Sequence, residues 1–164
     1  MDSFSARDFR TALGCFATGI AIMTAREPDG RFVGITVNSF SSVSLDPPLV
    51  SFCLDRNANS LNGFLSAAHF GVNVLSEGQE PLSAAFARSS GGDKFVGVDF
   101  TVGENGCPLL ADCLTHLECI REAVHDAGDH LLVIGRVIRL GQRTEGRPLL
   151  YFRGRYARLG EAQS

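Results

Sequence analysis

The sequence predicts a mainly β protein, an antiparallel barrel with a few peripheral α-helices. The 164 residues include 18 glycines, which indicates numerous tight turns. Short apolar runs recur between Pro- and Gly-containing turns, as strands do. Only two or three short segments have helical spacing, and no linker or repeat divides the chain. We therefore expect a single domain over residues 1–164.

The N-terminal part is expected to form a helix followed by a β-hairpin. Ser5 is a suitable N-cap for the helix. Apolar residues then follow with helical spacing, namely Phe9, Leu13 and Phe16. The apolar runs 20–25 and 32–36 are separated by a Pro-Asp-Gly turn signal at 28–30 and therefore predict two paired strands.

The rest of the chain alternates between short apolar runs and turn-forming residues. Its expected elements are a buried strand at 49–54, a short helix through Leu61 and Leu65 capped by Asn57 or Asn59, a strand at 69–75, a helix at 80–88 with Leu82, Ala85 and Phe86 on one face, and strands around 114–123, 131–140 and 149–152.

Composition and charge exclude several function classes. The net charge of −3 and the absence of a basic run argue against nucleic acid or an anionic membrane as the main partner. No apolar run approaches the length of a membrane span. The first residues lack the basic region and apolar core of a secretory signal. A cytoplasmic protein is therefore expected.

The five cysteines predict free thiols rather than a disulfide framework, because their number is odd and none forms a C-x-x-C pair. Cys107, Cys113 and Cys119 are equally spaced, and His116 lies between the last two. If this stretch is a strand, alternation directs His116 to the face opposite Cys113 and Cys119. A metal site is therefore not expected here.

The segment 34–48 carries an unusual density of polar side chains between two apolar strands. Six of the nine residues 36–44 bear a hydroxyl or an amide. Because Phe40 and Val43 lie among them, we expect the segment to be partly buried, and buried polar groups need partners. Two interpretations stay open: a turn satisfied by backbone, or a site for a flat ligand with a polar edge.

Two further segments have an open interpretation. Arg56, Ser60 and the N–H groups of a predicted helix start would suit a phosphate, although they also fit an ordinary N-cap with a solvated Arg. In the turn 128–130, Gly128 and Asp129 are usual turn residues, but His130 opens the next strand. That histidine could be structural or functional.

The segment 34–50, GITVNSFSSVSLDPPLV, resembles the signature of the short-chain flavin reductases, the reductase components of two-component flavin monooxygenases. The resemblance extends in order to residues 70–75, 93–95, 128–130 and 135–137, and it covers roughly residues 9–159. The 34–48 motif is specific at this length, whereas each of the other matches is weak alone.

The resemblance implies a split β-barrel with a Greek-key arrangement and a homodimer whose flavin site lies near the subunit interface. It implies hydride transfer from NADH or NADPH to FMN or FAD, which supplies reduced flavin to a partner monooxygenase. The flavin itself could be either a substrate or a tightly bound cofactor.

The resemblance also assigns residues to the site. The flavin ring and ribityl chain would be lined by Thr36, Val37, Asn38 and Ser39, and the isoalloxazine edge by Ser42 and Val43, with Cys53 in the strand behind it. The phosphate would be bound by Asn57, Asn59 and Ser60, and the loop region that helps close over the cofactor would contain Phe86, Lys94 and Phe95. The nicotinamide side would be formed by His130 and Tyr151. His130 is the candidate catalytic residue, expected to orient the nicotinamide rather than to donate a proton.

Hydride transfer between two cofactors explains why the sequence shows no catalytic triad or carboxylate pair. Because the cofactors carry the difficult step of hydride transfer, no catalytic triad or carboxylate pair is required. No G-x-G-x-x-G fingerprint follows a predicted strand, so NADH is expected in a shallow groove over the flavin rather than in a Rossmann domain.

Three alternatives remain open at this point. The first is a flavoenzyme similar to pyridoxamine phosphate oxidases, although these need a more basic phosphate site than Arg56 and Lys94 provide. The second is an electron carrier or sensor that holds its flavin tightly. The third is a barrel without cofactor that acts as an interaction module.

Overall fold

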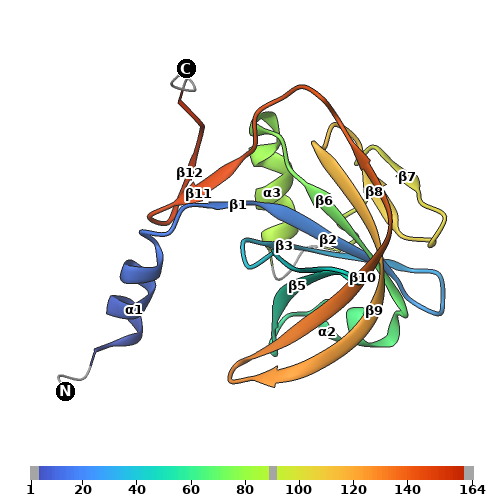
Figure 1. The fold of residues 1–164 in the computed structure, drawn as a ribbon, viewed down its shortest axis with the longest axis horizontal. Coiled ribbons are helices and arrows are strands. Elements are labelled where there is room, and N and C mark those ends of the chain that lie inside the picture. The colour runs from blue at the N-terminus through green and yellow to red at the C-terminus, as the bar shows by residue number, and fades with distance from the viewer. Residues whose placement is uncertain (1–3, 89–91, 161–164) are drawn as a thin grey trace.

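A computed structural model describes residues 4–88 and 92–160 of the chain. Its main feature is one seven-stranded antiparallel sheet in the order β3-β2-β6-β9-β10-β5-β4 (Figure 1). These strands are β2 (Ala21–Arg26), β3 (Phe32–Val37), β4 (Ser41–Leu45), β5 (Pro48–Asp55), β6 (His69–Val74), β9 (Thr115–Ala127) and β10 (His130–Gln142).

The two edges of this sheet, β3 and β4, are consecutive in the chain and joined by residues 38–40. No backbone ladder pairs β3 with β4 in the described part of the chain. The polar segment predicted from the sequence therefore spans the opening between the two sheet edges.

Smaller elements surround the sheet. Two short sheets combine β1 (Thr18–Gly19) with β11 (Leu150–Phe152) and β12 (Arg155–Ala157), and β7 (Phe100–Val102) with β8 (Pro108–Leu110). The helices are α1 (Ala6–Leu13), α2 (Leu61–Ser66), the 3-10 turn η1 (Glu77–Gln79) and α3 (Glu80–Ala87). None of the helices within the described residues is long and apolar enough to cross a membrane.

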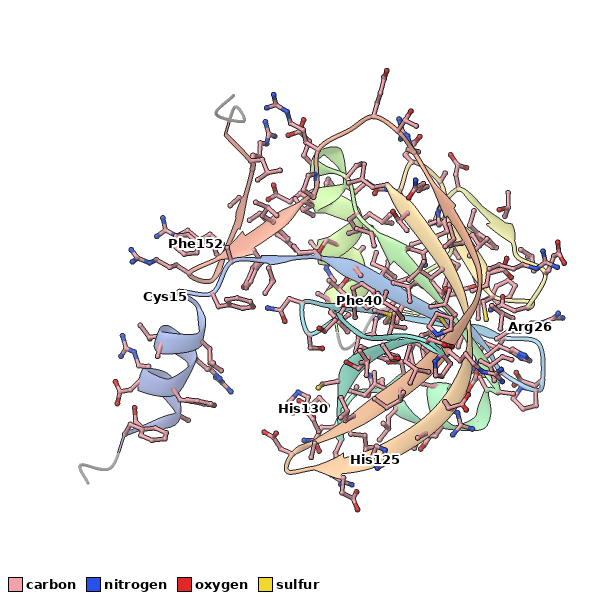
Figure 2. All side chains as sticks on the ribbon, in the orientation of Figure 1. Cys15, Arg26, Phe40, His125, His130 and Phe152 are labelled. Atoms are coloured by element: carbon pink, nitrogen blue, oxygen red, sulfur yellow. The ribbon has the colours of Figure 1, made fainter. Side chains whose placement is uncertain are left out.

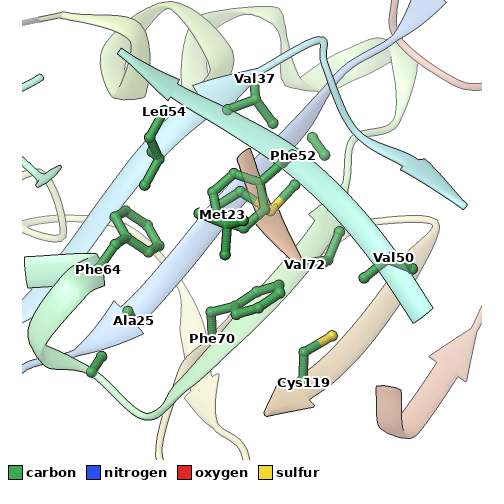
Figure 3. Packing of buried hydrophobic residues seen from close by; sticks show 13 residues of the cluster. Met23, Ala25, Val37, Val50, Phe52, Leu54, Phe64, Phe70, Val72 and Cys119 are labelled. Atoms are coloured by element: carbon green, nitrogen blue, oxygen red, sulfur yellow. The ribbon is translucent and has the colours of Figure 1, made fainter. Parts of the chain in front are cut away.

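One apolar core lies on the concave side of the sheet (Figure 3). Alternation along β5 buries Val50, Phe52 and Leu54. The ring of Phe52 packs 5.1 Å from that of Phe70 and 5.9 Å from that of Phe64, centroid to centroid. This packing ties α2 and β6 to β5, and so fixes where the loop after β5 leaves the sheet.

A second core packs α3 against β2 and β8. The ring of Phe86 packs edge-on against Phe95, 5.1 Å between centroids. Gly34 is required beneath it, because a Cβ at this position would lie 2.5 Å from the Phe86 ring. The first residue of the 34–48 motif is therefore explained by packing.

Most predicted elements are confirmed, and the mainly β, antiparallel class with few helices is confirmed with them. The hairpin β2–β3, the buried strand β5, helix α3 and the long β9 and β10 lie where the sequence places them. The boundaries of two helices differ. α1 ends at Leu13, so Phe16 lies outside it, and α2 has Ser60 as its N-cap rather than Asn57 or Asn59.

The expectation that residues 36–44 are partly buried is wrong for the second half of the segment. Residues 41–45 form the edge strand β4, in which Val43 is 52% exposed and Leu45 is 94% exposed. The cause is topological, since β4 pairs only with β5 and no described element covers its outer side. Strands β1, β7, β8 and β12 were also not predicted, because each has only two or three residues.

Helix α1 stands apart from the sheet (Figure 1). Ser5 caps it as predicted, in a capping box with Asp8. None of its residues is buried, and its apolar side chains Phe9 and Leu13 are both more than half exposed. The capping box therefore stabilises the helix locally, but no buried packing contact holds its apolar face within the described part of one chain.

Candidate functional site

Four adjoining hollows follow β3 from its C-terminal to its N-terminal end, and we call them together the β3 groove. They adjoin because neighbouring hollows share lining residues. The α1 hollow, about 920 Å³, shares Asn38 and Tyr151 with the Asn38 hollow, about 190 Å³. The Asn38 hollow shares Ala87 with the Ser60 hollow, about 260 Å³.

The Ser60 hollow in turn adjoins the Arg31 hollow, about 250 Å³. These two share Asn59, Ser60 and Lys94. The lining residues from β3 and its two flanking positions run from Asn38 at one end to Arg31 at the other. The groove thus has the length of a whole strand, roughly 23 Å at about 3.3 Å per residue.

The Asn38 end is built from hydroxyl groups whose hydrogen bonds join four elements. The Thr36 hydroxyl donates to the Ser83 carbonyl at 2.7 Å, and the Tyr156 hydroxyl donates to Ser83 Oγ at 3.0 Å. Ser39 Oγ accepts a hydrogen bond from the Cys53 backbone N–H at 2.9 Å. These bonds connect β3, α3, β5 and β12 around the hollow and orient its polar wall.

One hydroxyl at this end has no protein partner. Thr18 Oγ1 is the buried side-chain oxygen without a hydrogen bond among the described residues, and Thr18 lines the α1 hollow together with Asn38 and Ser39. An unsatisfied buried hydroxyl costs free energy. Together with the exposed Asn38 amide, it provides a donor and acceptor set suited to a polar ring edge.

Lys94, the only lysine of the chain, is the cationic centre of the other end. Its Nζ donates to the carbonyl of Phe86 at 2.9 Å and to that of Gly34 at 3.2 Å. Desolvation in this half-buried position lowers the pKa of the Lys94 ammonium. An ammonium has three donors, so one remains for an anion in the hollow, which Ser60 also lines.

Arg56 does not direct its charge into this hollow. Its Nε donates to the Gly128 carbonyl at 3.0 Å, and its Nη2 bonds the Asp126 carboxylate. The Arg56 backbone N–H donates to the Asp129 carbonyl at 3.0 Å. The side chain therefore joins the loop after β5 to the tip of the β9–β10 hairpin, and the expected contact with a phosphate does not follow from its geometry.

The structure brings most of the predicted site residues to the groove. The Asn38 hollow is lined by Thr36, Val37, Asn38 and Tyr151, and the α1 hollow by Ser39. The Ser60 hollow is lined by Asn57, Asn59, Ser60, Phe86 and Lys94, and the Arg31 hollow by Phe95. Of these, Val37, Phe86 and Phe95 are buried core residues that form walls.

Four predicted residues, Ser42, Val43, Cys53 and His130, line none of these four hollows in a single chain. Ser42 and Val43 lie on the exposed edge strand β4. Cys53 is half-buried on β5, on the face opposite Phe52 and Leu54.

His130 opens β10 at the tip of the hairpin, below Phe40 in the view of Figure 2. Its register partner on β5 is Asp55. Its Nδ1 lies 2.7 Å from Asp129 Oδ1, and this hydrogen bond lowers the pKa of the Asp129 carboxyl. The imidazole is thus oriented by its neighbour, with Nε2 left for another group.

Several groove residues were not identified from the sequence, among them Ser83, Tyr156 and Arg31. Ser83 lies in the middle of α3, Tyr156 in the short β12, and Arg31 in the turn before β3. Nothing in their local sequence marks them, because the chain segments that meet at the groove are far apart. The contact between Ser83 and Tyr156, for example, joins residues 73 positions apart.

Comparison with known proteins identifies the family. Residues 13–160 match the model of the flavin reductase like domain. The chain belongs to this family. A curated member, the FMN reductase (NADH) SmoA of Agrobacterium fabrum, is 43% identical over 154 residues, which are 94% of this chain and 86% of that protein.

Two further members show the same breadth of similarity. The reductase subunit HsaB of a flavin-dependent monooxygenase from Rhodococcus jostii is 43% identical over 155 residues, covering 94% of this chain and 78% of HsaB. The solved structure of Streptomyces globisporus NADH:FAD oxidoreductase SgcE6, in complex with NAD and FAD fragments, superposes with a TM-score of 0.90 at 34% identity and covers 98% of each chain.

The geometry at Lys94 predicts that this side chain recognises the phosphate of a flavin. We expect Lys94→Met to weaken FMN binding by roughly tenfold, about 1.4 kcal/mol, because a charge-assisted hydrogen bond is lost. Riboflavin, which has no phosphate, is expected to lose less affinity than FMN, because it loses only the effect of the Lys94 bonds to Gly34 and Phe86 on the shape of the groove. Titration of flavin fluorescence measures both constants.

The lowered pKa of Lys94 predicts a pH dependence of FMN binding with a defined sign. Because the pKa of Lys94 is lowered from 10.5, the amine loses its charge at a pH below that value. FMN affinity is therefore expected to fall more steeply than riboflavin affinity as the pH rises toward 10, and Lys94→Arg is expected to abolish this difference. A fall that is equal for both ligands would contradict the assignment.

Proposed function

We propose that this protein is a flavin reductase that transfers a hydride from NADH or NADPH to FMN or FAD and supplies reduced flavin to a partner monooxygenase. The observation that carries the proposal is the β3 groove, with polar and aromatic walls at Asn38 and a cation at Lys94. The names of its relatives support it: SmoA is an FMN reductase (NADH), and HsaB is a monooxygenase subunit.

We propose that the fold is a split barrel with a Greek-key arrangement, which suits this function. The sheet has β3 and β4 as its edges, and the chain passes from one edge to the other through residues 38–40. A flat ring placed at this opening would meet backbone and hydroxyl groups that no neighbouring strand occupies. The split is therefore the proposed place for the ring.

The groove residues suit a flavin in their chemical type and in their order along the groove. Thr36, Val37, Asn38 and Ser39 would hold the ring and ribityl chain, with Tyr151 at the same end. Asn57, Asn59, Ser60 and Lys94 would hold the phosphate, while Phe86 and Phe95 keep the wall between them rigid. A bound flavin supplies the ring that accepts the hydride. The protein's own task is to bind, orient and exclude water.

We propose a homodimer, in which a second copy covers the outer side of β4 and the apolar face of α1. Both surfaces are apolar and exposed in one chain, with Leu45 and Phe9 as examples. A second copy there would place Ser42, Val43 and Cys53 in an enclosed site near the interface. Light scattering after size-exclusion chromatography tests this, and a monomeric mass would contradict it.

We propose that His130 binds the nicotinamide side of the hydride donor. Asp129 holds Nδ1, so Nε2 is directed to the substrate. The residue acts by position, because hydride transfer needs no proton at this point. A cytoplasmic location fits the five free thiols, three of which, Cys107, Cys113 and Cys119, are buried.

The two flavin-dependent alternatives differ from this proposal in testable ways. An oxidase of pyridoxamine phosphate would need several cations at the phosphate. Here Lys94 and Arg88 line the Ser60 hollow, whereas Arg56 bonds Asp126 and Gly128. An electron carrier would hold its flavin in stoichiometric amounts and would not oxidise NADH.

The proposed function predicts oxidation of NADH or NADPH that depends on added flavin. The purified protein is mixed under air with each nicotinamide and with riboflavin, FMN or FAD, and the loss of absorbance of the reduced nicotinamide is followed. Turnover with at least one pair is expected. No oxidation with any pair would contradict the proposal.

His130→Ala is expected to raise the KM for NADH by about tenfold, because an oriented hydrogen bond to the donor is lost. The Kd of the flavin should stay within about twofold of the original protein. His125→Ala is a matched control on the same hairpin, and it is expected to leave both constants unchanged. If His130→Ala changes neither KM nor kcat, His130 has no role in the reaction.

A further inference from the structure

The Arg31 hollow lies beyond the place proposed for the flavin phosphate. It adjoins the Ser60 hollow through Asn59, Ser60 and Lys94, and continues along β3 toward Arg31. A mononucleotide such as FMN ends at its phosphate, so it would leave this hollow of about 250 Å³ unfilled. A dinucleotide continues from the same phosphate into a second phosphate, a ribose and a base.

We propose that the Arg31 hollow binds the adenosine monophosphate half of FAD, and that the protein therefore selects FAD over FMN. The proposal rests on the proposed function, since it extends the same groove. It assigns a role to Arg31, Phe32, Val33 and Asp93, none of which takes part in binding the ring or the first phosphate.

The charges suit a diphosphate. Lys94 lines both hollows and lies where the first phosphate would end, while Arg31 lines only the outer one. Arg31 Nε bonds the Glu27 carboxylate, which holds the guanidinium in place, and the side chain is 70% exposed. Its terminal N–H groups remain available to a second phosphate.

The walls of the hollow suit an adenosine. Phe32 is fixed by edge-to-face packing on Phe100, with ring centroids 5.5 Å apart, and by a tilted contact with Phe95 at 5.7 Å. Together with Val33 it offers an apolar wall to a base. Asp93 Oδ1 accepts the Phe95 N–H at 2.9 Å, and the carboxylate has further acceptor sites for a ribose hydroxyl.

NADH carries the same adenosine diphosphate chemistry, so two ligands could supply it. The shared residues favour FAD: Asn59, Ser60 and Lys94 connect the Arg31 hollow to the phosphate end of the flavin groove. His130, proposed for the nicotinamide, lines neither of these two hollows. The experiment below separates the two sources.

The test measures the Kd of FAD and of FMN for the full-length protein and for Arg31→Glu, by quenching of flavin fluorescence. The unmodified protein is expected to bind FAD at least about tenfold more tightly than FMN. Arg31→Glu places a carboxylate beside the second phosphate and should remove most of this preference, with FMN affinity within about twofold. Arg31→Gln should cause a smaller loss in the same direction.

Arg139→Glu is a matched control. Arg139 is also an exposed arginine paired with a glutamate, Glu104, and it lies outside the β3 groove. This variant should retain the FAD preference. Unchanged FMN binding in Arg31→Glu also shows that the variant is folded, and Arg31→Gln provides the same comparison if the charge reversal disturbs the hairpin.

Three results would overturn the proposal. The first is equal affinity of the unmodified protein for FAD and FMN, and the second is an equal loss of both flavins in Arg31→Glu. The third is that Arg31→Glu raises the KM for NADH, measured with FMN as acceptor, while FAD binding is unchanged. That result would assign the hollow to NADH. Failure of the proposed function looks different, because then neither flavin binds and no NADH is oxidised.

Discussion

The groove depends on the contact among Gly34, Phe86 and Lys94. The Phe86 ring lies directly on Gly34, where no side chain fits, and the Lys94 ammonium bonds the carbonyls of both residues. This contact joins β3, the end of α3 and the segment after it, which are the two walls and the cationic end of the groove. Any side chain at position 34 would separate them by displacing the Phe86 ring.

From this contact the groove changes in chemical character along one strand. At Asn38 it offers amide and hydroxyl groups and two tyrosines, and at Lys94 it offers a cation with a lowered pKa. Hydride transfer between two bound cofactors needs this kind of site, because the protein contributes orientation and electrostatics rather than a nucleophile. The hydroxyl bonds of Thr36 and Ser39 serve orientation, since they hold the polar wall to α3 and β5.

The sequence predicted the elements that are determined by interactions between residues close in the chain. A short, nearly continuous apolar run identified β5, the turn at Gly30 identified the hairpin, and the 34–48 motif identified the strand that lines the groove. Properties set by distant partners were missed. Arg56 is directed away from the groove by Asp126, 70 residues later, and β4 is exposed because it became a sheet edge. The roles of Ser42, Val43, Cys53 and His130 stay predictions, because a single chain does not bring them to the groove.

The central claim is that the β3 groove holds the flavin, and hydrogen–deuterium exchange with and without FAD tests it directly. Binding should slow exchange in three segments that line the groove: β3 with residues 38 and 39, residues 57–60, and α3. The β7–β8 hairpin, which lines no part of the groove, should exchange equally in both states. Unchanged exchange along β3, with protection elsewhere in the molecule, would contradict the account.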